Sequence, residues 1–467
     1  MSHRSRLTLT ALALVAAGAV APMAQASGFQ LKEQSASSEG NAFAGVSAGG
    51  NDISTMFFNP AGLTQYSGMQ FVMGGTLIAA KAEMSDATGT RNAYFGAFNQ
   101  SYLPISPNSP ASYGNSAVAK AAPNVYGMYS FSDDLKLGLS INAPFGFVTE
   151  YDSNYVGRYH ALKTDLMIID VAPSLAYRIN KEWSVGVTFV ARYADATLTN
   201  AVDFGLIGFP NTIPGTLDGS AKLTGSTWAY GFKAGVTFQP TDDLRLGLAY
   251  HGAMDMTLKG KIAFQYPGNT PAPALAGFQA MGFKDGGGSA ELNLPADISF
   301  GFDYKVSSTF SLQGEVSQTT WSRFKVLDAK LSDNVAPQVT DVITEEHWRD
   351  TMFYSLGGTW KLSPALTLRA GLALEQGAVP DGYRTPRIPD GDRTWASIGA
   401  SYAFSKALTL DFGYTHIWVK DSVIELTTTG IPTPQNPNPD PNFTRGNLNG
   451  NYTMSANVVA AGLRYAF

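Results

Sequence analysis

The chain has 467 residues, a formal net charge of −5 and no cysteine. These values exclude a disulfide framework and a thiolate metal site, and they argue against nucleic acid as a partner. Charged residues make up only 15% of the chain, yet no stretch reaches the roughly 20 apolar residues of a membrane helix. A sheet with one apolar and one polar face explains this balance, because its alternation hides an apolar band in the average.

Residues 1–26 are predicted to be a secretory signal peptide. Arg4 and Arg6 give a positive start, residues 7–20 form a short apolar run, and Ala24-Gln25-Ala26 is a small-residue cleavage signature. An N-terminal membrane anchor is the alternative, but the apolar run is too short to cross a bilayer comfortably. The sequence therefore indicates an exported protein.

Hairpins recur along the rest of the chain. Apolar and polar residues alternate in residues 232–239 and again in 244–250, on either side of the polar turn 240–243. Alternation with period two on both sides of a tight turn is typical of a β-hairpin with one apolar face. The same unit surrounds five other short turns: 132–134, 180–182, 307–308, 363–364 and 405–406. With one strand before these hairpins (69–81) and one after them (453–467), the pattern predicts an all-β antiparallel barrel of about 14 strands over residues 69–467.

The connections between the strands alternate in length. Long connections are predicted at 82–121, 146–166, 197–225, 257–292, 322–349, 378–392 and 420–452. Short turns on one side and long loops on the other are typical of a barrel in the outer membrane of a Gram-negative bacterium. Aromatic residues collect beside the short turns, as an interfacial girdle requires: Tyr129, Phe131, Tyr177, Trp183, Tyr304, Phe310, Trp360, Tyr402 and Phe404.

The chain ends on alternating apolar residues. Val459, Leu463, Tyr465 and Phe467 keep period two to the last position. A terminal Phe after such a strand resembles the signal by which the barrel-assembly machinery recognises its substrates. We therefore expect Phe467 to serve assembly, outer-membrane lipid to surround the barrel, and the protein to act as a monomer.

Residues 27–68 precede the first strand and hold the motif Asn59-Pro60-Ala61. Two readings of this segment stay open. It could fold into the lumen as a hatch, or it could be a disordered periplasmic tail. Its apolar content is unusual for a tail: Phe29, Leu31, Phe43, Ile53, Met56, Phe57 and Phe58.

Short motifs along nearly the whole exported chain resemble one family, the outer-membrane long-chain fatty-acid transporters and their relatives that admit aromatic hydrocarbons. They are residues 27–31 (SGFQL), 59–61 (NPA), 142–146 (NAPFG), 157–161 (GRYHA), 388–390 (IPD) with 392–393 (DR), and 465–467 (YAF). Each is weak alone, but their order and spacing are specific.

The resemblance implies a 14-stranded barrel with an N-terminal hatch in the lumen. It also implies a kink in the third strand at Pro144, Phe145 and Gly146, which opens a gap for lateral exit. Proline cannot donate a ladder hydrogen bond and glycine permits a bulge, so these residues suit a kink. The alternative is that the strand simply ends there.

Two predicted loops are unusually apolar for exposed segments, which indicates a binding surface. The alternative is that they pack on each other as a lid. In the resembled family, an outer substrate groove lies between the same two loops. The candidate groove residues are Phe204, Leu206, Ile207 and Phe209 in the first loop and Phe264, Tyr266 and Phe278 in the second.

Strand parity turns Arg192 and Arg349 toward the lumen, where either could bind a carboxylate through paired hydrogen bonds. The alternative for each is a structural ion pair with lumen acids such as Glu315, Glu375 or Asp411. Arg349 falls where the resembled family has a basic pocket residue, whereas Arg192 matches only loosely. Phe29 matches a pocket phenylalanine of that family.

We therefore expect passive transport of long-chain fatty acids, captured at an outer groove and released laterally. Uptake of aromatic or alkane hydrocarbons is the alternative, and a general open porin is a weaker one. No histidine has a recognisable catalytic spacing, and no His, Asp or Glu cluster has metal-ligand spacing. Neither an enzyme, nor a metal site, nor a cofactor is predicted.

Overall fold

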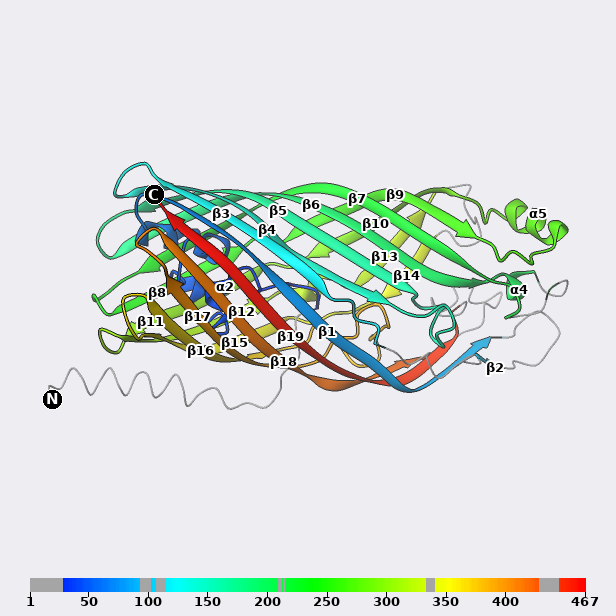
Figure 1. The fold of residues 1–467 in the computed structure, drawn as a ribbon. Coiled ribbons are helices and arrows are strands. Elements are labelled where there is room, and N and C mark those ends of the chain that lie inside the picture. The colour runs from blue at the N-terminus through cyan, green and yellow to red at the C-terminus, as the bar shows by residue number, and fades with distance from the viewer. Residues whose placement is uncertain are drawn as a thin grey trace.

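A computed structural model shows the fold (Figure 1) and describes residues 28–92, 102–105, 115–208, 212, 215–332, 341–427 and 445–467. The predicted signal peptide and the groove candidate Phe209 lie outside these residues. No helix within the described ranges is long and apolar enough to cross a membrane.

The described residues form one antiparallel sheet of nineteen strand segments. The segments are β1 (Met69–Asn92), β2 (Tyr102–Pro104), β3 (Lys120–Ser130), β4 (Leu135–Glu150), β5 (Lys163–Arg178), β6 (Trp183–Asp203), β7 (Asp218–Phe238), β8 (Leu244–His251), β9 (Met254–Gln265), β10 (Gly286–Leu294), β11 (Asp297–Lys305), β12 (Phe310–Thr319), β13 (Val326–Leu331), β14 (Asp341–Glu345), β15 (Thr351–Lys361), β16 (Leu366–Glu375), β17 (Arg393–Ala403), β18 (Leu408–Leu426) and β19 (Asn447–Ala466).

These segments make a closed barrel of 14 strands, which confirms the predicted fold class and strand number. Five barrel strands are interrupted and appear as two segments each: β2 with β3, β8 with β9, β10 with β11, β12 with β13, and β14 with β15. One interruption contains Pro295, which has no N–H for the ladder. The barrel closes where β1 pairs with β19, from Gln70–Ala466 to Thr90–Asn447.

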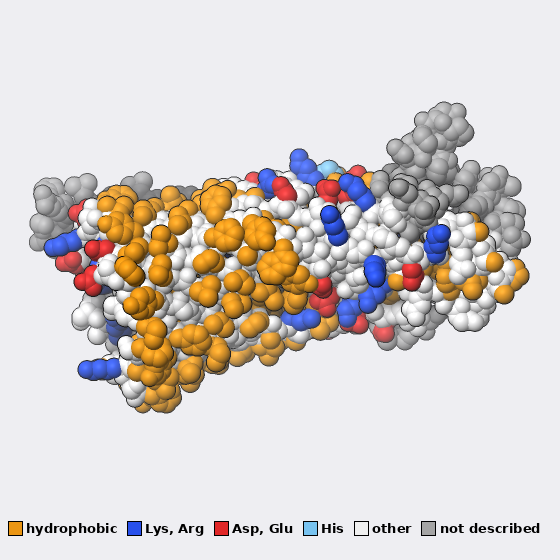
Figure 2. Space-filling view, turned by 90° about the horizontal axis from the view of Figure 1, so that it is seen from above, with side chains coloured by type: hydrophobic (Ala, Val, Ile, Leu, Met, Phe, Trp, Pro, Cys, Tyr) orange, Lys and Arg blue, Asp and Glu red, His pale blue; other side chains and the backbone are white. Residues whose placement is uncertain are grey.

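The outer surface follows the predicted alternation. In β6, Trp183, Val185 and Phe189 are exposed, whereas the intervening Ser184 and Thr188 are buried. All nine aromatic residues predicted for the girdle beside the short turns are exposed. In Figure 2, hydrophobic side chains cover the half of the barrel with the short turns, and charged side chains appear beyond them. This surface suits an apolar membrane with polar water on either side.

Several strands are longer than the sequence predicted. The first was expected at 69–81 but runs to Asn92, and the connection expected at 197–225 shrinks to 204–217, because β6 and β7 stay paired as far as Asp203–Asp218. Apolar alternation marks only the part of a strand that faces lipid. Backbone hydrogen bonds continue the ladder through polar residues beyond it, so the hydrophobic pattern underestimates strand length.

Residues 28–66 lie inside the barrel, where they form α2 (Ala36–Glu39), η1 (Val46–Ala48), α3 (Thr55–Phe58) and η2 (Pro60–Gln65). Figure 1 shows α2 within the barrel, toward the end that carries the C-terminus. Three further helices are described: α4 (Phe204–Ile207) and α5 (Ala272–Ala280) lie in the connections at the other end, and η4 (Trp321–Arg323) lies in the interruption between β12 and β13.

Apolar residues of this segment pack against the inner wall. Phe43 stands edge-on to Trp395 of β17, with ring centroids 6.3 Å apart, and belongs to the same buried cluster as Tyr126 and Phe353 of the wall. Glycines in the wall allow the backbone of the N-terminal segment to lie directly against the backbone of the strands. A Cβ added to Gly247 would lie 1.8 Å from the backbone oxygen of Ser47.

The predicted hatch motif, Asn59-Pro60-Ala61, is part of this contact. The Asn59 side chain donates to the Ser47 carbonyl at 2.6 Å and to the Val236 carbonyl of β7 at 3.1 Å. It also accepts from the Ala61 N–H at 3.0 Å, which caps η2. The motif therefore joins two parts of the segment to the barrel wall.

Candidate functional site

The wall of the barrel is incomplete between β3 and β4. Among the described residues, pairing of these strands ends at Val125–Ile141. Immediately beyond, the register of β4 against β5 shifts between Asn142 and Phe145, as a β-bulge does. The bulge bends β4 away from β3 and leaves the two strands apart at this level.

The N-terminal segment takes the free edge of β4. Leu31 N–H donates to the Pro144 carbonyl at 2.8 Å, and Gly146 N–H donates to the Phe29 carbonyl at 3.0 Å. Pro144 itself has no N–H to offer β3. Because β4 continues through the bulge to Glu150, the alternative that the strand ends at residue 146 is wrong.

The Phe29 ring is buried among aromatic side chains. Its centroid lies 4.8 Å from Trp321, 5.6 Å from Trp348 and 5.9 Å from Phe145, in edge-to-face arrangements. Such pairs stabilise by about 0.5–1.5 kcal/mol each beyond the burial of apolar area. The ring forms part of the boundary of two cavities.

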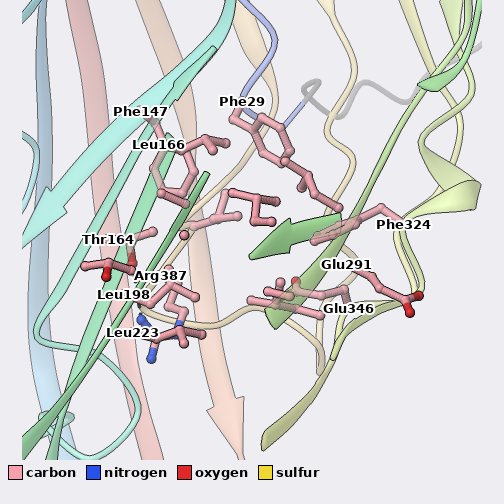
Figure 3. Close-up of a pocket in the computed structure, with 18 of the residues that line it drawn as sticks. Phe29, Phe147, Thr164, Leu166, Leu198, Leu223, Glu291, Phe324, Glu346 and Arg387 are labelled. Atoms are coloured by element: carbon pink, nitrogen blue, oxygen red, sulfur yellow. Dashed lines mark hydrogen bonds between the residues drawn. The ribbon is translucent and has the colours of Figure 1, made fainter. Parts of the chain in front are cut away.

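The first, the narrow cavity, has a volume of about 60 Å³ and lies inside the barrel (Figure 3). Its lining is almost entirely apolar. Most of the lining residues lie on strands, at positions whose side chains face the lumen. The main lining residues are Phe29, Phe147, Leu166, Leu198, Leu223, Leu258, Leu292, Phe324 and Leu327. Figure 3 shows Phe29 and Phe147 at one end and Arg387 near Thr164 at the other.

Arg387 and Glu346 are the ionisable groups at the buried end of this cavity. The Arg387 guanidinium donates to Thr164 Oγ1 at 3.4 Å and makes no ion pair within the described part of the chain. Burial, reinforced by the nearby charge of Arg445, lowers the pKa of Arg387 to about 9. Burial also raises the pKa of Glu346 to about 8, although Trp348 Nε1 donates to its carboxylate at 2.8 Å. At pH 7 the cavity therefore holds a charged arginine and a mainly neutral glutamic acid.

The second, the wide cavity, has a volume of about 560 Å³ and lies at the gap between β3 and β4. Residues 28–31, the bulged part of β4 and the facing parts of β1, β3 and β19 line it. Its cations are already paired. Lys120 lies 3.5 Å from Asp165, and Arg393 lies 3.3 Å from Asp390.

The two arginines chosen by strand parity lie elsewhere. Arg192 is buried as predicted, but its Nε and Nη2 donate to the two oxygens of the Asp170 carboxylate, at 2.7 and 2.8 Å. This is a structural ion pair, although with a partner that the sequence did not suggest. Arg349 is exposed, donates to the Gly377 carbonyl at 3.4 Å, and lines neither cavity.

The two apolar loops pack on each other, as their alternative reading proposed. Phe204 and Phe278 are fully buried with their ring centroids 5.0 Å apart, and Tyr266 lies 4.6 Å from Phe204. Ile207 and Phe264 pack against the same core, which we call the loop cluster. Leu206 is half-buried beside them.

Sequence reasoning missed Arg387, Glu346 and Thr164. Arg387 directly precedes the Ile388-Pro389-Asp390 motif, so proximity to a motif could have drawn attention to it. The alternation of faces along a strand could not have identified Arg387, because it assigns an inward face only to strand residues. Within the described residues, no group of three or more His, Asp or Glu side chains could hold a metal ion.

Comparison with known proteins identifies the fold and the family. The model of the outer membrane protein transport protein family (OMPP1/FadL/TodX) matches residues 17–467. The chain belongs to this family. A 47 kDa outer membrane protein of Pasteurella multocida is 31% identical over 92% of this chain and 96% of its own length. A long-chain fatty acid transport protein of Salmonella typhi is 29% identical over 89% and 93%, respectively.

Among solved structures, a FadL homologue of Pseudomonas aeruginosa superposes with a TM-score of 0.81 over 94% of this chain and all of that one, at 24% identity. This likeness confirms the barrel fold. The OMPP1/FadL/TodX family member described here is therefore an outer-membrane transporter of hydrophobic compounds and not an enzyme.

Proposed function

We propose that the protein carries long-chain fatty acids passively across the outer membrane and releases them sideways through the gap between β3 and β4. One observation carries the proposal: Phe29 lines both the narrow cavity and the wide cavity at that gap. A small movement of residues 28–31 would join the two cavities into one apolar path. A substrate coming from outside the cell would meet the loop cluster first. The two loops of this cluster would have to separate before the substrate could enter.

The charge of the narrow cavity favours a fatty acid over a hydrocarbon. An alkyl chain fits the apolar lining, and a carboxylate fits the charged Arg387 beside neutral Glu346. We therefore propose Arg387 as the carboxylate ligand, in place of Arg349 and Arg192, because it alone of the three lines a cavity. The fatty acid transport protein of Salmonella typhi, at 29% identity, supports this substrate class.

We also propose that residues 28–66 act as a hatch that closes the lumen. Their burial and the anchoring of Asn59 to the wall support this role over a disordered tail. A hatched barrel is not a general open porin. We further propose that the protein acts as a monomer. We also propose that the assembly machinery recognises Phe467, which is exposed.

Binding of labelled oleate and toluene to the purified protein tests the substrate. We expect oleate to bind, and R387Q to weaken it by about 10- to 100-fold, because a hydrogen bond to a charged group contributes about 1.5–3 kcal/mol. R349Q is the matched control and should leave the affinity unchanged. Equal oleate binding by R387Q and the wild type, or binding of toluene alone, would contradict the proposal.

A further inference from the structure

The outer face of β7 and β9 carries three exposed lysines close together. Lys259 and Lys261 are two residues apart on β9, so their side chains share one face about 7 Å apart. Lys261 pairs with Thr224 of β7, and Lys222 stands two residues from Thr224 on the same face. The three residues, which we call the lysine triad, therefore surround one spot on the barrel surface.

The triad lies just beyond the apolar band. Lys259 pairs with Ser226 of β7, and the next outward residues along β7 are Trp228, Tyr230 and Phe232, all more than half exposed. Aromatic residues of this kind mark the level of the lipid headgroups. Figure 2, which looks onto the side where β6, β7 and β9 lie uppermost in Figure 1, shows hydrophobic side chains giving way to charged side chains of both signs in this direction.

Two of the nearby acids pair with other cations, and Asp285 accepts a hydrogen bond from the Phe264 N–H at 3.0 Å. Asp255 pairs with Arg323 at 2.8 Å, and Glu291 pairs with Lys330 at 3.1 Å. Asp195 of β6 is separated from Lys259 by the intervening Ser226. Within the described residues, no member of the triad makes an ion pair. The triad therefore has no direct carboxylate partner among the described residues and lies beside the aromatic residues that mark the headgroup level.

We propose that Lys222, Lys259 and Lys261 bind the phosphate groups of the phosphorylated glycolipid in the outer leaflet. Ammonium groups attract phosphate as point charges, and the hydroxyls of Thr224 and Ser226 lie between them as further donors. The exposed rings of Trp228 and Tyr230 then contact the upper acyl chains of the same lipid. This combination of charge above and apolar surface below fits a lipid headgroup better than a soluble anion. The inference is independent of the transported substrate.

The test uses the full-length protein in detergent and diphosphorylated lipid A as the probe. K259Q/K261Q should lower the affinity roughly 25-fold at low salt, since each lysine near an anionic lipid surface contributes about fivefold. Lipid A stripped of both phosphates should bind the wild type at least as weakly as diphosphorylated lipid A binds the variant, because the variant still contains Lys222. The control, K181Q/K406Q, removes two lysines from the short turns and should leave the affinity unchanged.

The proposal would be overturned by unchanged affinity of K259Q/K261Q, by an equal loss in the control variant, or by equal binding of lipid A with and without phosphates. Displacement of the lipid by inorganic phosphate alone would also overturn it, because that result would show a free-anion site. The substituted lysines are exposed, so both variants should keep the wild-type unfolding temperature.

Discussion

The narrow and the wide cavities meet at Phe29 but differ in charge and enclosure. The narrow cavity lies within the barrel and ends on Arg387, whose charge is not neutralised by an ion pair in the described structure. The wide cavity lies at the gap in the wall, and each of its cations already has a carboxylate partner. Under the proposed function, the narrow cavity would bind an amphipathic ligand, and the wide cavity would offer it no competing charge.

Apart from the aromatic contacts of Phe29, the boundary between the cavities is held by few hydrogen bonds. Two backbone hydrogen bonds join residues 29–31 to the bulged β4. By contrast, the later part of the N-terminal segment is fixed through Asn59, through Ser47, whose N–H donates to Glu315 at 3.1 Å, and through buried Phe43. We therefore expect the first residues to move while the rest stays in place.

The largest effect should come from locking that boundary. Gln30 and Phe145 form an isolated antiparallel bridge, and the chain has no cysteine, so Q30C/F145C can form one disulfide only. Opposed residues of such a pair lie within disulfide reach. Oxidised Q30C/F145C should reduce the uptake of labelled oleate by cells to the background level but keep oleate binding in the narrow cavity.

T64C/S184C is the control lock, because these two side chains already touch, with their hydroxyls 2.9 Å apart. It fixes the anchored part of the segment and should not change uptake. Reduction should restore uptake by Q30C/F145C. Normal uptake by the oxidised Q30C/F145C protein would show that substrate does not pass Phe29.

A smaller but still clear effect should follow from displacing the anchored residues 35–66. These residues separate both cavities from the end of the barrel that carries the C-terminus. In G247V the new side chain would collide with Ser47, so residues 35–66 could not seat, and overpacking of this kind costs about 1–3 kcal/mol. The intact protein should show little single-channel conductance in planar bilayers, and G247V several-fold more.

G127V provides the matched control, since a Cβ at Gly127 meets nothing within 4 Å. It should conduct as little as the wild type. A large current through the unmodified protein would contradict the proposed hatch and favour an open porin.

The most local effect concerns pH, and it involves only the narrow cavity. Glu346 is neutral below its pKa of about 8 and negative above it, while the Arg387 guanidinium keeps its charge at neutral pH. A bound carboxylate is therefore favoured at pH 7 and opposed as pH rises. Oleate affinity should fall about tenfold between pH 7 and 9.

E346Q cannot ionise, so its oleate affinity should change much less over the same range. A wild-type affinity that stays constant from pH 7 to 9 would remove Glu346 from the binding site. A fall of equal size in E346Q would assign the pH dependence to Arg387 or to the ligand.

The sequence by itself determined the architecture. Period-two alternation and short turns predicted the 14 strands, because the pleat places successive side chains on opposite faces whatever the rest of the chain does. The same parity correctly turned Arg192 inward. The apolar content of residues 27–68 raised the possibility of a hatch, and the structure places residues 28–66 in the lumen.

Only the tertiary structure decided which side chains meet. Asp170 stands opposite Arg192 because of the register between β5 and β6, and register is a relation between two strands that parity within one strand does not specify. Arg387 lies in a connection, where no period exists, so its place in the narrow cavity depends on how the loop folds back into the barrel. The narrow and wide cavities likewise arise from a bulge in one strand and a segment more than a hundred residues before it in the chain.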